Sequence, residues 1–194
     1  MEEVSLIQML DARERRVHHQ QELLARYGKP LVCFTMNIAG PVKDTPLIRR
    51  GFARGRQLLE RQFLRCRWTP LSTDVSRAVT GCEAFYVLDA SPLEIKRLTT
   101  LVEDASPLGR LFDMDVLCPD GRKVDREELQ LEGRRCLLCG GPAKVCSSRR
   151  VHTVAALQEK TTEILTRTFT ELDAATAAQQ AVRALLYEVT TTPK

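Results

Sequence analysis

The chain has 194 residues, of which 43% are hydrophobic and 28% are charged, with a formal net charge of +4 at pH 7. This length suits one domain, and the composition is typical of globular proteins, which excludes fibrous and disordered classes. The small positive charge favours anionic partners, such as polyphosphates or an acidic protein surface, and does not by itself indicate nucleic acid.

The first elements of the chain predict a helix followed by a buried strand. Ser5 can cap a helix that runs to about Tyr27, where Gly28 ends it. Residues 31–38 then form a compact apolar run with β-branched members. Such a run is typical of a strand that is buried on both faces.

A loop at residues 39–45 separates this strand from a second predicted helix. Asp44 or Thr45 would cap that helix, which extends to about Leu64. Gly51 and Gly55 lie four residues apart within it. They would weaken the helix unless another element packs closely against them.

The rest of the chain predicts shorter elements and one long helix, while residues 66–80 give no clear pattern. In order, they are a strand at 85–88, a helix from Ser91 to about Asp104, a strand at 111–117, a turn at 119–121, a returning strand at 122–124, a cysteine-bearing loop at 134–152 and a helical segment at 153–190. This interleaving predicts a single α+β domain over residues 1–194, with a mixed sheet, packed helices and a long C-terminal helix.

The predicted strand at 111–117 carries two carboxylates. Asp113 and Asp115 are two residues apart, so they share one face, with their Cα atoms about 7 Å apart. Such a pair can hold Mg²⁺ against substrate phosphates, and Arg110 and Gly109 just upstream could meet a leaving diphosphate. The alternative is a half-exposed strand with two solvated aspartates.

Several basic and polar residues near the first strand are candidate phosphate contacts. Gly40 and Lys43 lie between a strand and a helix, where anions bind well, although the spacing is not that of a P-loop. Arg49 and Arg50 follow on the helix, where the alternative is a solvated basic face. Weaker candidates are Asn37 at the strand end and Arg13 on the first helix.

A cluster of cysteines and one histidine has the spacing of a metal site. Cys136, Cys139, Cys146 and His152 follow the pattern C-x2-C-x6-C-x5-H. Three thiolates and one imidazole complete a tetrahedral set for structural Zn²⁺, leaving no open position for catalysis. The alternative is a group of reduced thiols in a loop, and a redox motif is disfavoured because no thioredoxin-like pattern surrounds it.

Compartment is predicted from the cysteines and the first residues. Seven cysteines with no basic and apolar leader at the start indicate a reducing compartment, so we expect a cytoplasmic protein. No apolar run of about 18 residues occurs, so we expect no membrane span.

Together these motifs resemble the apo-citrate lyase phosphoribosyl-dephospho-CoA transferase family, also called holo-citrate lyase synthases. The resemblance extends from about Leu10 to about Leu165, with one departure at Ser106, where the family commonly has histidine. The segments that carry it are Arg-Glu-Arg at 13–15, Gly-Pro-Val-Lys-Asp at 40–44, the paired Arg49-Arg50, the block at 107–116 and Arg-Arg-Cys-Leu-Leu-Cys at 134–139.

The resemblance implies a transferase with a nucleotidyltransferase-like fold. The donor would be 2′-(5″-triphosphoribosyl)-3′-dephospho-CoA, and the acceptor a serine of the citrate lyase acyl carrier (gamma) subunit, with release of diphosphate. It implies that Asp113 and Asp115 hold Mg²⁺ against the triphosphate. Arg110, Lys43 and Arg49 would then stabilise the charge on the transferring group.

Other functions remain open at this point. One is an equivalent synthase for another carrier protein, such as that of malonate decarboxylase, and another is a non-catalytic factor that binds the carrier. A third is a zinc-stabilised nucleic-acid-binding module. Aromatic residues make up only 5% of the chain, and single-strand binders need aromatic stacking surfaces, so we expect no nucleic acid partner.

Overall fold

The structure is a computed structural model that describes residues 2–191, with side chains as far as residue 180. The helices and strands, in order, are α1 (Leu6–Tyr27), β1 (Leu31–Met36), α2 (Pro46–Arg65), β2 (Ser72–Ala78), β3 (Gly81–Val87), α3 (Pro92–Asp104), β4 (Phe112–Leu117), α4 (Ala143–Ser148) and α5 (Val154–Thr191). Two short 3₁₀ turns, η1 (Gly109–Leu111) and η2 (Arg126–Leu129), flank β4 in the sequence. Among the described residues, no helix is both long and apolar enough to span a bilayer.

The four strands form one sheet in the order β2-β3-β1-β4. The prediction of a mixed sheet is wrong, because every described pairing is antiparallel. Each helical crossover does join two strands that run in the same direction, but another strand lies between them. β3 separates β1 from β2, and β1 separates β3 from β4. The α+β class is retained.

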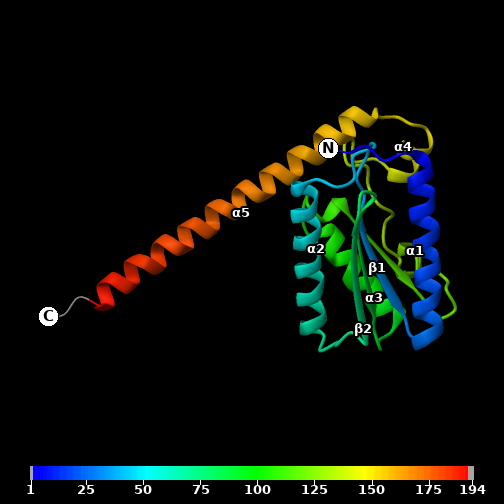
Figure 1. Cartoon of the computed structure of the whole chain (residues 1–194), viewed down its shortest axis with the longest axis horizontal. Helices are drawn as coiled ribbons and strands as arrows, with labels where there is room; N and C mark the ends of the chain where they lie inside the picture. The colour runs from blue at the N-terminus through cyan, green and yellow to red at the C-terminus, as the bar shows by residue number, and fades with distance from the viewer. Residues whose placement is uncertain (1, 192–194) are drawn as a thin grey trace.

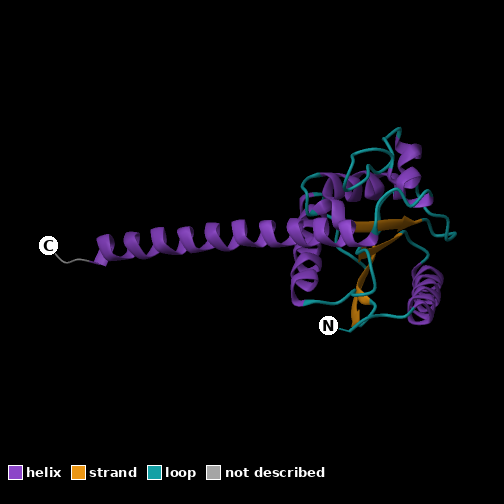
Figure 2. Ribbon diagram, turned by 90° about the horizontal axis from the view of Figure 1, so that it is seen from above, coloured by secondary structure: helices purple, strands orange, loops and turns teal. Residues whose placement is uncertain are grey.

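The sheet has two unequal faces (Figures 1 and 2). On the main face, Val32, Phe34 and Met114 are fully buried in the large core beneath α2, α3 and the start of α5. On the other face, a smaller core that includes Cys33 and Phe85 packs against the C-terminal half of α1. This smaller core does not include Asp113 and Asp115 of β4, and the candidate site lies there.

Two glycines let α2 approach the sheet closely, as the sequence required. A Cβ on Gly55 would lie 2.5 Å from Phe34 Cζ and 2.9 Å from Phe112 Cε1. A Cβ on Gly51 would lie 2.8 Å from a methyl carbon of Leu165 on α5. The two glycines therefore lower the helix propensity of α2 but allow it to pack closely against both the β-sheet and α5.

The long helix α5 is anchored only by its first part. Ile164, Leu165 and Phe169 are buried, and beyond them the helix projects away from the rest of the molecule (Figure 1). Arg50 of α2 lies over the ring of Phe169 at 4.3 Å and pairs with Asp173 at 2.7 Å.

Helix caps account for the accuracy of the predicted starts. Ser5 forms a capping box with Gln8, and Thr45 accepts a hydrogen bond from the Ile48 N–H. Ser91 occupies the N-cap of α3 but makes no side-chain cap bond. The predicted returning strand at 122–124 is reduced to a single bridge between Leu117 and Lys123, and the cysteine-bearing loop contains the short helix α4.

Replacing Gly55 with alanine should destabilise the protein, although alanine is the better helix former. The added methyl meets two aromatic rings in a close-packed core, and overpacking of this kind costs about 1–3 kcal/mol. Gly133→Ala is the matched control, because nothing lies within 4 Å of its Cβ position. Urea unfolding followed by circular dichroism measures both, and equal stability of the two variants would contradict this account of the α2 contact.

Candidate active site and metal centre

The acidic pair lies on β4, one of the two edge strands of the sheet. Asp113 is paired in register with Thr35 of β1, and Asp115 with Cys33. Burial alternates along the strand, so Phe112, Met114 and Val116 point into the main core. Both carboxylates therefore project from the opposite face, which is the face that α1 covers only in part.

Each carboxylate has a cationic partner from a segment later in the chain. Arg134 pairs with Asp113 Oδ1 at 3.0 Å, and Lys123 pairs with Asp115 Oδ1 at 2.6 Å. Burial raises the pKa of Asp113, the negative charge of Asp115 raises it further, and Arg134 opposes both. Mutual repulsion is thus only partly compensated, and a bound cation would relieve it.

Side chains of α3 occupy the free edge of β4. Glu103 Oε1 accepts a hydrogen bond from the Met114 N–H at 2.8 Å, and Lys96 Nζ donates to the Met114 carbonyl at 3.2 Å. Glu103 Oε2 also pairs with Arg126 at 2.5 Å, and the Glu103 side chain is only 3% exposed. Burial lowers the pKa of Lys96, while the charge of Glu103 opposes that shift. These contacts hold the strand that carries the acidic pair.

Three adjoining cavities lie in this region; Asp113 lines two of them and Asp115 lines one. The first, the α1 cavity of about 160 Å³, is lined by Asp113 together with Arg13, Asn37 and Lys43. Three of the predicted substrate contacts therefore come together beside an acidic residue. Burial lowers the pKa of Lys43, as does the nearby charge of Arg13, and its Nζ donates to the Ile38 carbonyl.

The second, the β4 cavity of about 490 Å³, is lined by Asp113, Asp115, Lys123 and Arg134. Asp125 lines it too and offers a further carboxylate. Here the acidic pair and its two cationic partners face a common space large enough for a polyphosphate.

The third, the arginine cavity of about 610 Å³, adjoins both others through Asn37 and Arg134. Arg110 lines this cavity, and its guanidinium donates to the Arg135 carbonyl. Apolar side chains also line it, among them Leu137 and Leu157. Its mixture of arginines and apolar groups is suited to an organic phosphate.

Four predicted contacts lie outside these cavities and have other partners. Arg49 pairs with Asp44 at 3.0 Å, and Arg50 holds α5. The N–H of Gly109 donates to Ser106 Oγ at 3.1 Å, and a Cβ there would lie 2.6 Å from two carbonyl oxygens of α3. A Cβ on Gly40 would collide with the Gln158 side chain.

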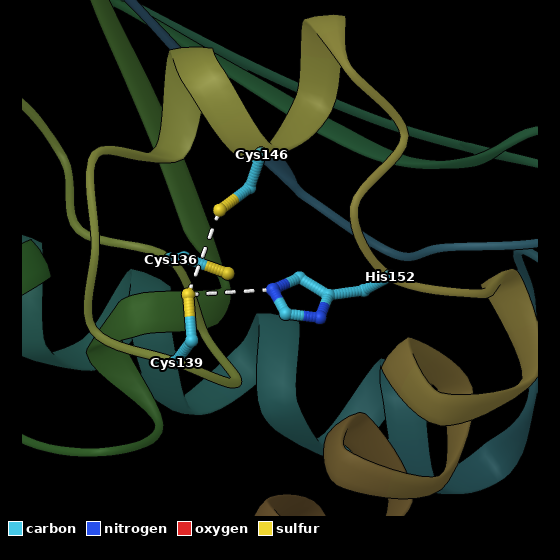
Figure 3. Close-up of side chains that lie close together, drawn as sticks. All are labelled: Cys136, Cys139, Cys146 and His152. Atoms are coloured by element: carbon cyan, nitrogen blue, oxygen red, sulfur yellow. Dashed lines mark hydrogen bonds between the residues drawn. The ribbon is translucent and has the colours of Figure 1, made fainter.

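The three cysteines and the histidine lie close together (Figure 3), and Cys136, Cys146 and His152 also line the arginine cavity. One potential ligand atom from each of Cys136, Cys139, Cys146 and His152 lies within 4.8 Å of all the others. Cys139 Sγ is 3.5 Å from Cys146 Sγ and 3.3 Å from His152 Nε2. The predicted ligand set therefore forms one cluster, which is made by a turn, by α4 and by the residues that precede α5.

Hydrogen bonds shift the pKa values of two thiols of this cluster in opposite directions. Burial raises the pKa of Cys136, but hydrogen bonds from the N–H groups of Cys139 and Leu138 outweigh it and bring that pKa down to about 7. A hydrogen bond with Cys139 raises the pKa of Cys146 to about 11. The Cys136 thiol is therefore more readily deprotonated than that of Cys146.

Four important residues were not predicted from the sequence: Lys96, Glu103, Lys123 and Arg134. Lys123 lies on the returning segment after β4, so its position beside Asp115 follows from the turn at 119–121. In the sequence, Arg134 is marked only by its position next to the cysteine motif. Nothing in the sequence of α3 marks Lys96 and Glu103 as buried.

A carboxylate pair on a rigid strand, surrounded by cation-lined cavities, is typical of enzymes that transfer phosphate-linked groups. A sequence model of one such family, described as apo-citrate lyase phosphoribosyl-dephospho-CoA transferase, matches residues 4–168. The chain belongs to this family.

Individual relatives agree with the family match. A probable apo-citrate lyase phosphoribosyl-dephospho-CoA transferase of Vibrio cholerae serotype O1 is 38% identical over 162 residues, which cover 83% of this chain and 91% of the relative. The enzyme of that name from Citrobacter koseri is 35% identical, over 79% of this chain and 84% of its own length. The one from Shigella boydii serotype 18 is 33% identical, over 84% and 88%.

The pKa of Asp113 should change when the charge of either neighbour, Asp115 or Arg134, is removed. We expect its pKa to fall in Asp115→Asn, which removes a negative charge, and to rise in Arg134→Gln, which removes a positive one. Because protons compete with cations for the carboxylate, divalent-cation affinity should increase as pH rises through this pKa. Carbon-detected NMR of the side-chain carboxyl measures the shifts, and an unchanged pKa in Asp115→Asn would rule out the coupling.

Removing the buried carboxylate of Glu103 should destabilise the whole protein. Glu103→Leu removes the acceptor of the Met114 N–H and one of the two carboxylates that pair with Arg126, which keeps Asp104 at 2.8 Å. Loss of such charge-assisted hydrogen bonds should cost about 1.5–3 kcal/mol. Lys144→Ala removes an ion pair whose partners are 88% and 73% exposed, so its effect should stay below about 0.5 kcal/mol. Chemical denaturation compares the two, and similar small losses would refute the role assigned to Glu103.

Proposed function

We propose that this chain transfers the phosphoribosyl-dephospho-CoA group from 2′-(5″-triphosphoribosyl)-3′-dephospho-CoA to a serine of the citrate lyase acyl carrier protein. The observation that carries the proposal is the acidic pair among cation-lined cavities, located within the residues 4–168 that match the family. Group transfer from a triphosphate requires charge neutralisation and alignment, and these cavities offer both.

The bond changes follow from the two substrates. The serine hydroxyl oxygen attacks the phosphorus nearest the ribose, and the bond from that phosphorus to the bridging oxygen of the diphosphate breaks. A phosphodiester links the carrier to the prosthetic group, diphosphate leaves with the electron pair, and the hydroxyl proton is lost. We assign removal of the hydroxyl proton to Asp113, to Asp115 or to water between them.

Asp113 and Asp115 would hold Mg²⁺, which would neutralise charge on the triphosphate when bound. The donor set fits, because both groups offer hard oxygen ligands and Mg²⁺ commonly takes one or two carboxylates with substrate phosphates. Burial is the main cause of the raised pKa of Asp113, and the negative charge of Asp115 adds to it; a bound cation would oppose this second contribution. This arrangement of acids on a strand of a helix-covered sheet also supports a nucleotidyltransferase-like relationship.

The basic residues around the pair would bind the rest of the donor. Lys43 and Arg13 line the α1 cavity, and Arg110 and Arg134 line the arginine cavity on the other side of Asn37. Their guanidinium and ammonium groups can stabilise charge on the transferring phosphate and the leaving diphosphate. Arg49 and Arg50 would support the fold through their own ion pairs.

The acceptor and the compartment are part of the same proposal. The family match favours citrate lyase over the malonate decarboxylase type of carrier and over a nucleic-acid partner. We place the reaction in the cytoplasm, because all seven cysteines are free thiols and thiols persist in a reducing compartment.

Loss of either acidic side chain should abolish transfer. With purified carrier protein, the triphosphoribosyl donor and Mg²⁺, we expect the mass increase of the carrier to slow on the order of 10²-fold or more in Asp113→Asn and Asp115→Asn. Asp173→Asn, on the projecting part of α5, removes a carboxylate of an exposed ion pair and should retain full activity.

Mass spectrometry of the carrier gives the rate directly. Full activity in both acidic variants would end the assignment of the pair. Modification of a malonate decarboxylase carrier in preference to the citrate lyase carrier would replace the acceptor but keep the chemistry.

A further inference from the structure

The cysteine segment, residues 134–152, has almost no hydrophobic core of its own. Of these residues, all of which the structure describes, only Cys136 is buried. A segment of this length cannot offset its conformational entropy with so little apolar burial. Yet it presents arginines at defined places beside the acidic pair, so another interaction must hold it.

The four side chains of the cluster have the geometry of a closed zinc site. Tetrahedral Zn²⁺, with bonds of about 2.3 Å to sulfur and about 2.0 Å to nitrogen, places two sulfurs about 3.8 Å apart and sulfur and nitrogen about 3.5 Å apart. The corresponding distances are 3.5 Å between Cys139 and Cys146 and 3.3 Å between Cys139 and His152. Three soft thiolates and an imidazole favour Zn²⁺ over harder divalent cations.

The backbone around the cluster is shaped as a metal-binding turn. The Gly140 N–H donates to the Cys136 carbonyl at 3.1 Å, with Gly140 in the left-handed region at φ 72°. Arg135 bridges to Pro142 across the turn, which brings α4 and Cys146 back toward Cys136 and Cys139. His152 precedes the first turn of α5 and completes the set from the other side (Figure 3).

The same cluster forms one wall of the arginine cavity. Cys136, Cys146 and His152 line it. Arg134, two residues before Cys136, reaches Asp113, and the Arg135 carbonyl accepts from Arg110. An ion in the cluster would therefore fix the arginines of the cavity and their register with the acidic pair.

The lining of this cavity indicates what part of the donor it accepts. Four arginines line it, Arg110, Arg134, Arg135 and Arg150, together with the apolar side chains of Val151, Val154 and Leu157. A volume of about 610 Å³ suits a nucleotide-sized group with a flat apolar base and a phosphate. The triphosphate is already accounted for at Asp113 and Asp115, so the dephospho-CoA portion remains to be placed.

We propose that Cys136, Cys139, Cys146 and His152 bind one Zn²⁺ ion, and that this ion shapes the cavity in which the dephospho-CoA portion of the donor binds. The first half stands on the cluster alone, and the second half rests on the proposed function. The ion has no open coordination position and takes no part in the transfer step.

Metal analysis of the tag-free protein, purified under reducing conditions without added metal, tests the first half. We expect about one zinc per chain, lost in Cys139→Ser and His152→Ala. His152→Cys creates another complete four-ligand set and should retain the ion. Cys66→Ser alters an exposed cysteine at the end of α2 and is the matched control. Zinc well below one equivalent in the wild type, or retained in both ligand-loss variants, would overturn the site.

Calorimetric titration with dephospho-CoA alone tests the second half without any transfer step. The affinity should fall about tenfold or more in Cys139→Ser and stay unchanged in Cys66→Ser. If Cys139→Ser does not fold, wild-type protein stripped by a chelator and then reloaded with Zn²⁺ gives the same comparison, with affinity lost and regained.

The outcomes separate this inference from the proposed function. Unchanged dephospho-CoA affinity after zinc loss would refute the link between the ion and the cavity. Zinc-dependent binding together with no modification of any carrier would refute the proposed reaction and leave the zinc-shaped cavity intact.

Discussion

A single buried carboxylate, that of Glu103, connects the segments that build the site. One of its oxygens accepts from the backbone of β4, and the other pairs with Arg126 in η2. Arg134 lies 3.7 Å from it while pairing with Asp113. Burying a charge is costly unless its hydrogen bonds are met, so these partners must be present together. The edge of β4, the η2 turn and the cysteine segment are thereby held in one arrangement.

The same arrangement protects the exposed edge of the sheet. β4 has a neighbouring strand on one side only, and an unpaired edge invites pairing with other chains. Lys96 and Glu103 occupy the carbonyl and N–H of Met114, and the segment after the turn covers Val116 and Cys118. The strand can therefore present carboxylates at an edge without offering a free backbone ladder.

Local signals explain which parts of this structure could be predicted from the sequence. The caps at Ser5 and Thr45 and the alternation of β4 are encoded by neighbours within a few residues, so α1, α2 and the acidic pair were accessible. β2 was not, because its residues are polar or exposed on both faces and show no apolar period. Without β2, the helical crossovers suggested parallel neighbours, and the mixed sheet was a wrong prediction.

The parts of the site that could be predicted are those marked by spacing within one short segment. Asp113 and Asp115 follow from spacing, and the cysteine cluster follows from ligand spacing. The positions of Lys123, Arg134, Lys96 and Glu103 could not be predicted. They depend on tertiary contacts between segments that are distant in the sequence. Ser106 accepts a hydrogen bond from the Gly109 N–H and so supports the turn that carries Arg110.

The direction of α5 bears on how this enzyme can be handled. The helix starts beside the arginine cavity and runs outward for 38 residues, or about 57 Å at 1.5 Å per residue. Near the other terminus, the Val4 N–H donates to the Pro41 carbonyl, next to the loop that holds Lys43. An affinity tag or fluorescent fusion joined at the amino end would therefore lie close to the loop that holds Lys43, whereas α5 carries the chain away from the three cavities (Figure 1).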